Sequence, residues 1–376
     1  PRLSTYESIL PGFREVLHLP EPAVGWLEWL QELGYENIGD TQHALSSENE
    51  RPAEHSITTF LTNTFFNWLN GEDSSQSWFA HLSYLRPHPP FVAAGEWAQK
   101  YDPAQCEDPI GVAENRHWLH DVLLQHGATK APQSRSEMQH VRAQYYGNIS
   151  HVDEQLGRIF DELKRRGEWE NTVVVVSSDH GEQLGDQGLL NKAGFFESSY
   201  HIGCIVRVPQ YEAAHGNVVN EFTENIDIFP TLCEVMGEAI PLQCDGMSLS
   251  SFLHNETPVR WRDAATYEWD WRDVLIGIHP EHDAYRWPYD RRLEESHLTV
   301  RRSSEYAYVH FGDGSWLCFN VGDDPTWGTT TTDAEIVLRE AQAMLTWRAN
   351  HAERILAGML LENGGIGRRP AGFSSE

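Results

Sequence analysis

The sequence is poor in basic residues and contains no long apolar run. It has 28 lysines and arginines against 56 aspartates and glutamates, a formal charge of −28 at pH 7. Nucleic acids and anionic membranes are bound by basic surfaces, so this balance argues against both as partners. No run of about 18 apolar residues occurs, and we therefore expect no membrane-spanning helix. A negatively charged substrate would need a metal ion or local basic side chains to overcome the acidic background.

Cysteine is also scarce. The five cysteines are widely spaced and form no Cys-x-x-Cys pair. This argues against a disulfide framework or a structural zinc cluster and favours reduced, mostly buried thiols. The sequence begins with proline and shows no signal-like segment, which leaves a processed protein or a fragment open. The cellular location therefore stays open too, with the cytoplasm slightly favoured over the periplasm.

The length of 376 residues fits one large domain and a smaller one. Helical and strand-like segments alternate up to about residue 240, which predicts an α/β domain over residues 1–240 with a mostly parallel sheet flanked by helices. Its clearest helix follows Ser134, which resembles a capping box with Glu137, and ends near Gly167; apolar residues recur there every three or four positions.

The character of the sequence changes after Pro241. Aromatic segments with alternating polarity predict a small antiparallel sheet. A long helix from Ala334 to about Leu361 follows. Residues 241–376 are therefore expected to form a smaller α+β subdomain.

The most informative stretch is NTVVVVSSDHGEQLGDQGLLNK, residues 171–192. Its four valines are too few for a membrane span and too β-branched for a helix, so they predict a strand buried on both faces of a parallel sheet. Ligands bind beyond the carboxyl ends of such strands, where Asp179 and His180 follow. A carboxylate beside an imidazole suits Mg, Ca, Mn or Zn, provided that the chain turns at Gly181, because adjacent strand residues point to opposite faces. A hydrogen-bonded structural pair is the alternative.

Two further side chains are candidates for the same chemistry. Lys192 lies in a glycine-rich loop that returns from the same strand end, where its ammonium group would neutralise the oxygens of a bound anion. An ordinary solvated lysine is the alternative. His88 lies between two prolines that constrain its backbone and would orient the imidazole toward a leaving-group oxygen. The alternative is a surface histidine in a stiff loop.

Other clusters are weaker candidates. One is a set of metal-capable side chains in a polar loop, which favours a solvated connection: His279, Glu281, His282 and Asp283. Glu268 and Asp270 would point to one face of a strand as a carboxylate pair. Salt bridges to Arg262 or Arg272 explain that pair more simply.

Five stretches together resemble, in order and spacing, the sulfatase family of the alkaline phosphatase superfamily. They are YLRPHPPF (84–91), YYGNISHVDEQLGRIFDEL (145–163), TVVVVSSDHGEQLGDQGLLNK (172–192), IDIFPTLCEVMG (226–237) and CDGMSLSSFL (244–253). Within that family the variants EQLGDQGLLNK, QCDGMSLSSFL and YEWDWRDV are most similar to phosphonate monoester hydrolases, which also cleave phosphodiesters and some sulfate esters. The resemblance implies an alkaline phosphatase-like fold, here incomplete.

The resemblance also implies roles for the candidate residues. Asp179 and His180 would ligate one divalent metal ion, Lys192 would hold the anionic oxygens of a small ester substrate, and His88 would contact the substrate or its leaving group. Many sulfatases have Asn in place of His180, so the histidine favours the phosphonate and phosphodiester branch, although choline sulfatases resemble it too. Whether the protein forms a homo-oligomer stays open.

One departure from the family is severe. Its nucleophile is a formylglycine made from the Cys of Cys-x-Pro-x-Arg, or a Ser or Thr in the same place, and this sequence has no such motif. The family's N-terminal strand with its aspartate ligands is also missing, so we expect a truncated chain that turns over nothing by itself. For the intact protein we expect a metal-dependent hydrolase of phosphonate monoesters or phosphodiesters that forms a covalent intermediate. A sulfatase and a catalytically silent metal-binding module are the alternatives.

Overall fold

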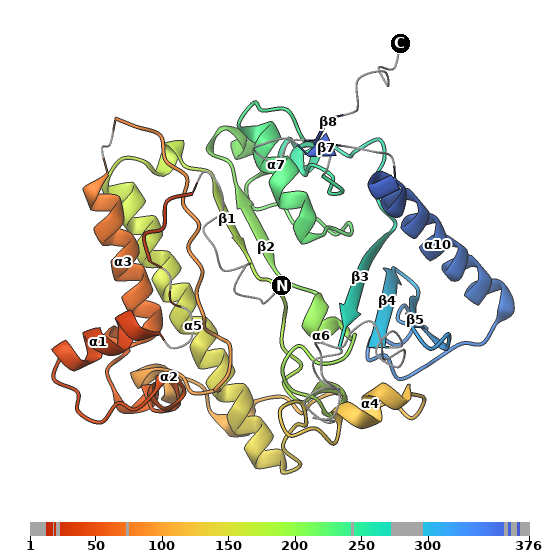
Figure 1. Ribbon diagram of the computed structural model, residues 1–376, viewed down its shortest axis with the longest axis horizontal. Helices are drawn as coiled ribbons and strands as arrows, with labels where there is room; N and C mark the ends of the chain where they lie inside the picture. Colours follow the sequence, from red (N-terminus) through yellow and green to blue (C-terminus); the bar gives the residue numbers. More distant parts are fainter. Residues whose placement is uncertain are drawn as a thin grey trace. The chain divides into compact units, whose positions relative to one another are not determined.

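The computed structural model of the protein describes residues 13–17, 19, 23–72, 75–241, 244–271, 296–356, 360–361 and 367–368 (Figure 1). Two compact units make up the chain. The first comprises Pro1–Asp108 with Pro132–Asn171, and the second comprises Pro109–Ala131 with Thr172–Glu376. This division follows packing and differs from the predicted boundary near residue 240, which stays a prediction about domain organisation.

The first unit is helical in its described part. Its α-helices are α1 (Val24–Glu32), α2 (Thr41–Ser46), α3 (Ile57–Gly71) and α5 (Arg135–Arg165). Short 3₁₀ helices connect them at Glu48–Glu50, Ala53–His55, Gly95–Gln99, Pro103–Gln105 and Trp169–Asn171. The predicted long helix is confirmed as α5, and the Ser134 hydroxyl accepts the Glu137 backbone N–H at its start.

The buried face of α5 differs from the predicted apolar stripe. Ile159 and Leu163 pack with Leu69 of α3 in one apolar cluster, but Ile149 of the predicted stripe is exposed. Nearer the start of the helix, most of the buried residues are polar: Gln139, Arg142, Gln144, Asn148, His151 and Gln155. The 3.6-residue period therefore predicted the helix correctly, but its apolar stripe is buried only toward the C-terminal end, and a mostly polar face is buried nearer the start.

The second unit contains the remaining described elements. Its α-helices are α4 (Trp118–Leu123), α6 (Glu197–Tyr200), α7 (Ile228–Val235), α8 (Ser250–Leu253) and α10 (Ala334–Leu356). Short 3₁₀ helices lie at Asp186–Gly188, Pro209–Ala214 and Asn225–Asp227. The strands are β1 (Val174–Ser177), β2 (Cys204–Arg207), β3 (Ala264–Asp270), β4 (His297–Ser303), β5 (Ala307–Phe311), β6 (Trp316–Phe319), β7 (Leu360–Leu361) and β8 (Gly367–Arg368).

The valine strand is present as β1, but its pairing corrects the expected parallel sheet. β1 pairs with β2 in antiparallel register, with Ser177 opposite Cys204. The segment 178–203 leaves and returns at the same end of β1, whereas a parallel partner requires a crossover to the opposite end. In the described part of the chain, strands β1 to β8 form only antiparallel pairs.

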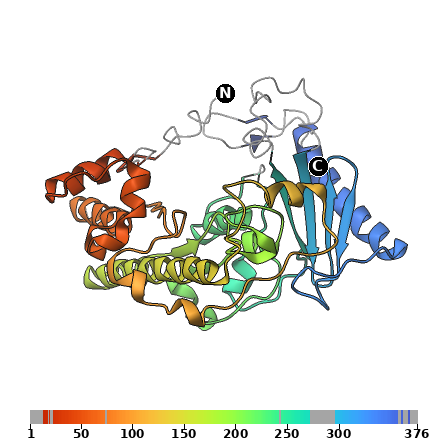
Figure 2. The same cartoon turned by 90° about the horizontal axis from the view of Figure 1, so that it is seen from below.

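The predicted C-terminal antiparallel sheet and long helix are confirmed. Strands β3, β4, β5 and β6 are neighbours in that order, each antiparallel to the next. Helix α10 lies along one face of this sheet (Figure 2), where Met344 packs with Tyr308 and Cys318. None of the helices in the described residues combines the length and apolar character needed to cross a bilayer.

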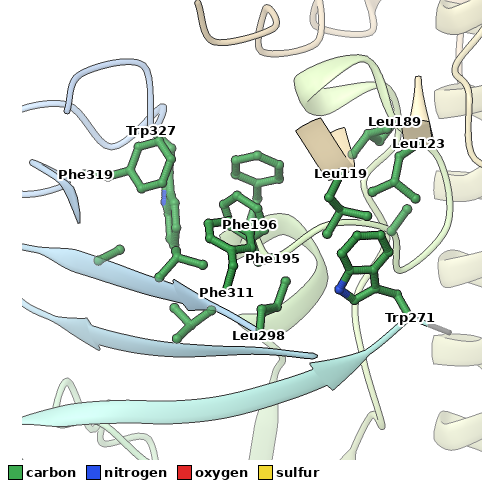
Figure 3. Packing of buried hydrophobic residues seen from close by; sticks show 14 of the residues in the cluster. Leu119, Leu123, Leu189, Phe195, Phe196, Trp271, Leu298, Phe311, Phe319 and Trp327 are labelled. Carbon is green, nitrogen blue, oxygen red and sulfur yellow. The ribbon is translucent and has the colours of Figure 1, made fainter. Parts of the chain in front are cut away.

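The other face of the sheet carries the largest apolar cluster (Figure 3). Phe311 of β5 packs against Phe195, with ring centroids 5.6 Å apart and the rings nearly perpendicular. Phe196 and Trp327 belong to the same buried cluster. Because Phe195 and Phe196 follow Lys192 closely in sequence, this core fixes one end of the loop that carries the candidate lysine.

His151 predicts how the stability of the first unit depends on pH. The side chain is 1% exposed, and its Nε2 lies 3.2 Å from Thr59 Oγ1. Burial, assisted by Arg86 and Arg158, lowers the pKa of His151 from 6.5 to about 4. Between pH 6.5 and pH 4 this histidine binds more protons in the unfolded chain than in the folded chain. The stability of the first unit that depends on a neutral His151 is therefore fully present above pH 6.5 and is lost as the pH falls toward 4.

We expect this histidine to remove roughly 3 kcal/mol of unfolding free energy over that range. Urea denaturation at pH 7.5 and at pH 4.5 should show a smaller loss for His151→Gln, whose side chain cannot titrate, than for the unmodified protein. Equal losses in both proteins would show that His151 is not the group responsible.

Candidate metal centre and anion site

The candidate site begins where β1 ends at Ser177. Residues 174–176 are half-buried, so the strand is confirmed but its predicted burial on both faces is wrong. Gly181 passes so close to α6 that an added Cβ would lie 2.2 Å from the Ser198 carbonyl oxygen. The Gly181 N–H also donates to the Ser199 carbonyl at 2.7 Å. Glycine is therefore required here for close approach of two backbone segments.

Asp179 and His180 lie together at this turn. Their atoms Oδ2 and Nε2 are 3.6 Å apart, and the side chains are 86% and 27% exposed. This distance is too long for a hydrogen bond between the two side chains, but the His180 backbone N–H donates to Asp179 Oδ1 at 2.9 Å, so a hydrogen-bonded structural pair stays the alternative. The Nδ1 of His180 lies 2.8 Å from the Gly181 carbonyl oxygen. Since a carbonyl only accepts, Nδ1 is the donor in this contact, and in the neutral imidazole the lone pair is then on Nε2.

This arrangement fits a divalent metal ion. Carboxylate oxygen and imidazole nitrogen each bind such ions at about 2.1 Å, so ligands 3.6 Å apart reach one ion at a wide angle. A histidine whose other ring nitrogen donates to a backbone carbonyl is typical of metal sites. The described residues contain no group of three or more His, Cys, Asp or Glu side chains that would hold an ion. Asp179 and His180 are therefore at most part of the coordination sphere expected for such an ion.

Lys192 lies in a loop that is bonded to the residues directly after His180. The Glu182 Oε1 accepts the backbone N–H of Asn191 at 2.5 Å. The Gln183 N–H donates to the Asn191 carbonyl at 3.1 Å, and the Gln183 Nε2 donates to the Ala193 carbonyl at 3.0 Å. The main chain on both sides of the exposed Lys192 is thus held to the residues that follow the Asp179–His180 turn.

Glu182 and Gln183, which hold the Lys192 loop, were not among the residues predicted from the sequence. Burial raises the pKa of the Glu182 carboxyl to about 7, although backbone N–H groups of Leu184 and Asn191 act in the opposite direction. Gln183 is fully buried. The available signal was their position, as two polar residues between a strand end and a glycine-rich loop.

His88 belongs to the first unit and is exposed. Its loop is held by the buried Arg86, whose guanidinium donates to the carbonyl oxygens of His88 at 2.9 Å and Pro90 at 2.6 Å. Arg86 also forms a buried ion pair with Glu48 at 2.5 Å. Arg86 therefore holds this loop, whereas the constraint expected from the two prolines and the contact of His88 with substrate stay predictions. The second unit holds the other three candidates, Asp179, His180 and Lys192.

The carboxylates of Glu268 and Asp270 make separate contacts. Glu268 lies 3.3 Å from Arg348, and Asp270 lies 3.2 Å from His297. Glu268 thus forms a salt bridge, but with Arg348 and not with Arg262, an expected partner, which binds Asp227. The other expected partner and the weaker metal cluster lie outside the described residues: Arg272, His279, Glu281, His282 and Asp283.

All five cysteines are free thiols, as predicted. Cys106 and Cys318 are buried, whereas Cys204 is exposed and the other two are half-buried, so the expectation of mostly buried thiols holds only in part. Burial raises the pKa of the Cys318 thiol to about 12. This thiol therefore remains protonated at neutral pH and is a poor nucleophile.

Comparison with protein families shows which family this chain belongs to. The family model described as Sulfatase matches residues 21–238, more than half of the chain. The chain belongs to the sulfatase family. The C-terminal model of N-sulphoglucosamine sulphohydrolase matches residues 185–326 of this sulfatase-family chain.

Individual relatives agree with this assignment. The chain is 32% identical over 387 residues to the multifunctional alkaline phosphatase superfamily protein PehA of Trinickia caryophylli, covering 95% of this chain and 74% of PehA. It is 28% identical to the choline-sulfatase of Rhizobium meliloti, covering 66% of this chain and 52% of that enzyme. The crystal structure of the phosphonate monoester hydrolase of Agrobacterium radiobacter superposes with a TM-score of 0.81 at 31% identity, covering 98% of this chain and 78% of that one.

The predicted alkaline phosphatase-like fold is therefore confirmed, and the chain is a member of a family of ester hydrolases. Members of this superfamily use a divalent metal ion. The Asp179–His180 pair has the donor atoms and the spacing for such an ion.

The ion pair of Arg86, in the loop of His88, with Glu48 can be tested by mutation. Replacing Arg86 by Met leaves the Glu48 carboxylate buried without its cation, which typically costs about 3–5 kcal/mol. We expect Arg86→Met to lower the urea midpoint strongly. The matched control is Arg135→Met, because Arg135 pairs with Asp108 at the surface of the same unit and should leave the midpoint unchanged. Equal midpoints for both variants would contradict a supporting role of the buried pair.

Proposed function

We propose that the intact protein is a metal-dependent hydrolase of phosphonate monoesters and phosphodiesters that acts through a covalent intermediate. The observation that carries this proposal is the Asp179–His180 pair, with oxygen and nitrogen ligand atoms 3.6 Å apart at the end of β1. The similarity to PehA and to a phosphonate monoester hydrolase supports this substrate class over others. The substrate is then a small anionic ester, and the charge of −28 opposes nucleic acid or an anionic membrane as a partner.

Each candidate residue has a distinct task in this proposal. Asp179 and His180 hold the divalent ion, which when bound acts as a Lewis acid on an ester oxygen. Lys192 places its ammonium group against the anionic oxygens and stabilises the charge that develops in the transition state. His88 donates a proton to the leaving oxygen. The metal is Mn, Ca, Mg or Zn, since a mixed oxygen and nitrogen ligand set accommodates each of them.

The nucleophile lies outside these residues in our proposal. The 376 residues contain no Cys, Ser or Thr followed by x-Pro-x-Arg, the motif expected from the family resemblance. None of the five cysteines is followed by that pattern. A covalent intermediate therefore needs a nucleophile supplied by a polypeptide segment beyond the given sequence.

A sulfatase is the competing candidate, because the chain also resembles a choline-sulfatase and an arylsulfatase of Clostridium perfringens, the latter at 26% identity. A metal-binding module without catalytic activity is the alternative from another class. A sulfatase would differ from the proposed enzyme in its preferred substrate, whereas the metal-binding module would turn over no ester.

Substrate preference tests the proposal directly. The intact protein should hydrolyse an aryl phosphonate monoester and an aryl phosphodiester with higher kcat/KM than an aryl sulfate. Lys192→Ala should lower kcat for all three by about 10²-fold, because an oriented charge donor is lost. Lys164→Ala, which removes an exposed lysine of α5, is the control and should change nothing. A strong preference for the sulfate would reverse our ordering, and no turnover of any ester would favour the silent module.

The purified 376-residue chain should turn over none of these esters, because it lacks the motif for the nucleophile. Release of the aryl alcohol can be followed by absorbance at high protein concentration. Hydrolysis by this chain that disappears in Asp179→Ala would show that the nucleophile lies within the sequence given.

A further inference from the structure

We infer that Asn225 is a positioning residue for the metal ligand Asp179, an inference that rests on the proposed function. The Asn225 amide contacts both residues that precede Asp179. Its Nδ2 donates to the Ser178 carbonyl oxygen at 2.8 Å. Its Oδ1 accepts the Ser177 hydroxyl at 2.9 Å. One side chain thus satisfies two groups at the point where β1 gives way to the metal-binding turn.

The carbonyl of Ser178 belongs to the peptide group whose nitrogen is that of Asp179. A hydrogen bond to this oxygen restricts rotation of the planar peptide and therefore fixes the direction in which the Asp179 side chain leaves the backbone. The Ser178 hydroxyl donates to the His180 carbonyl at 2.7 Å and closes the same turn. Asp179 is 86% exposed, and its Oδ1 accepts the His180 backbone N–H at 2.9 Å, so the main chain of the turn rather than packing orients its carboxylate.

Asn225 is itself held firmly by its neighbours in sequence. It begins a 3₁₀ helix that ends at Asp227, whose side chain is fully buried. The Asp227 Oδ1 accepts the Arg262 guanidinium at 2.6 Å, and Oδ2 accepts the Glu224 N–H at 2.8 Å. The Glu224 carboxylate accepts the Thr266 N–H of β3 at 2.9 Å. The backbone is therefore anchored on both sides of Asn225, and its amide is presented to β1 in one place.

The exposure of Asn225 separates positioning from general stability. Because the side chain is exposed, truncation leaves no buried cavity and no buried polar group without water. Loss of the amide should therefore leave the fold intact and loosen the turn that carries Asp179. Changes in residues that orient a metal ligand typically weaken metal affinity by 10–100-fold.

The test is Mn²⁺ affinity, measured on the intact protein by the electron paramagnetic resonance signal of free Mn²⁺. Asn225→Ala should raise the Kd for Mn²⁺ about 10-fold while the urea midpoint stays unchanged. Ser177→Ala, which removes one of the two bonds to the Asn225 amide, should raise the Kd by a smaller factor. The matched control is Asn217→Ala, because the Asn217 amide bonds to Asn255 in the same unit and should not affect the Kd.

The double variant Ser177→Ala with Asn225→Ala should bind Mn²⁺ like Asn225→Ala alone, because both changes break the same contact. If Asp179→Ala abolishes binding while Asn225→Ala binds as tightly as the unmodified protein, the role of Asn225 is wrong and the proposed function stands. If Asn225→Ala lowers the urea midpoint, the Kd of Ser177→Ala for Mn²⁺ becomes the test. An unchanged Kd in Ser177→Ala then overturns the role of Asn225. If the unmodified protein and Asp179→Ala bind Mn²⁺ equally, or neither binds, the metal centre is wrong and the role of Asn225 falls with it.

Discussion

The candidate site depends on the bonding of residues 181–183 to the segment that follows Lys192. Gly181 and Glu182 donate their N–H groups to the carbonyls of Ser199 and Ser198, at 2.7 and 3.0 Å. The absent Cβ of Gly181 makes this approach sterically allowed. The chain therefore leaves the β conformation directly after β1, and Asp179 and His180 can face one ligand instead of opposite sides of a strand.

The antiparallel sheet β3–β6 supports this bonding through α6. Phe195 and Phe196, immediately before α6, lie in the buried aromatic core that the sheet provides (Figure 3). At the other end of α6, Tyr200 stacks on Tyr267 of β3 with ring centroids 4.3 Å apart. Because α6 supplies the carbonyls that accept the N–H groups of Gly181 and Glu182, the core of the sheet also determines where the Asp179–His180 turn lies. The C-terminal sheet is thus part of the framework of the site.

The sequence predicted those features that depend on local patterns. The β-branched run specified β1, the 3.6-residue period specified α5, and alternating polarity specified the sheet from β3 to β6. The pairing of β1 was wrong because the partner of a strand depends on the path of the connection, which periodicity does not encode. The polar buried face of α5 was missed because tertiary packing overrides the apolar stripe.

The candidate ligands were predictable because Asp179 and His180 are adjacent to each other and to a strand end. The residues that support the candidate site could not be predicted from the sequence. They come from distant parts of the sequence, or they are buried for reasons that a motif does not show. Asn225 reaches Ser178 across 47 positions, and Arg86, which supports the loop of His88 in the first unit, reaches Glu48 across 38. Family membership then narrows the chemistry to ester hydrolysis, while the sequence contains no motif for the nucleophile.

Anomalous diffraction from crystals of the intact protein grown with Mn²⁺ tests the central claim most directly. The account predicts a strong manganese peak about 2.1 Å from both Asp179 Oδ2 and His180 Nε2, with the imidazole Nδ1 still bonded to the Gly181 carbonyl. A manganese peak elsewhere, or clear density for both side chains without a peak between them, would contradict the assignment of this turn as the metal centre.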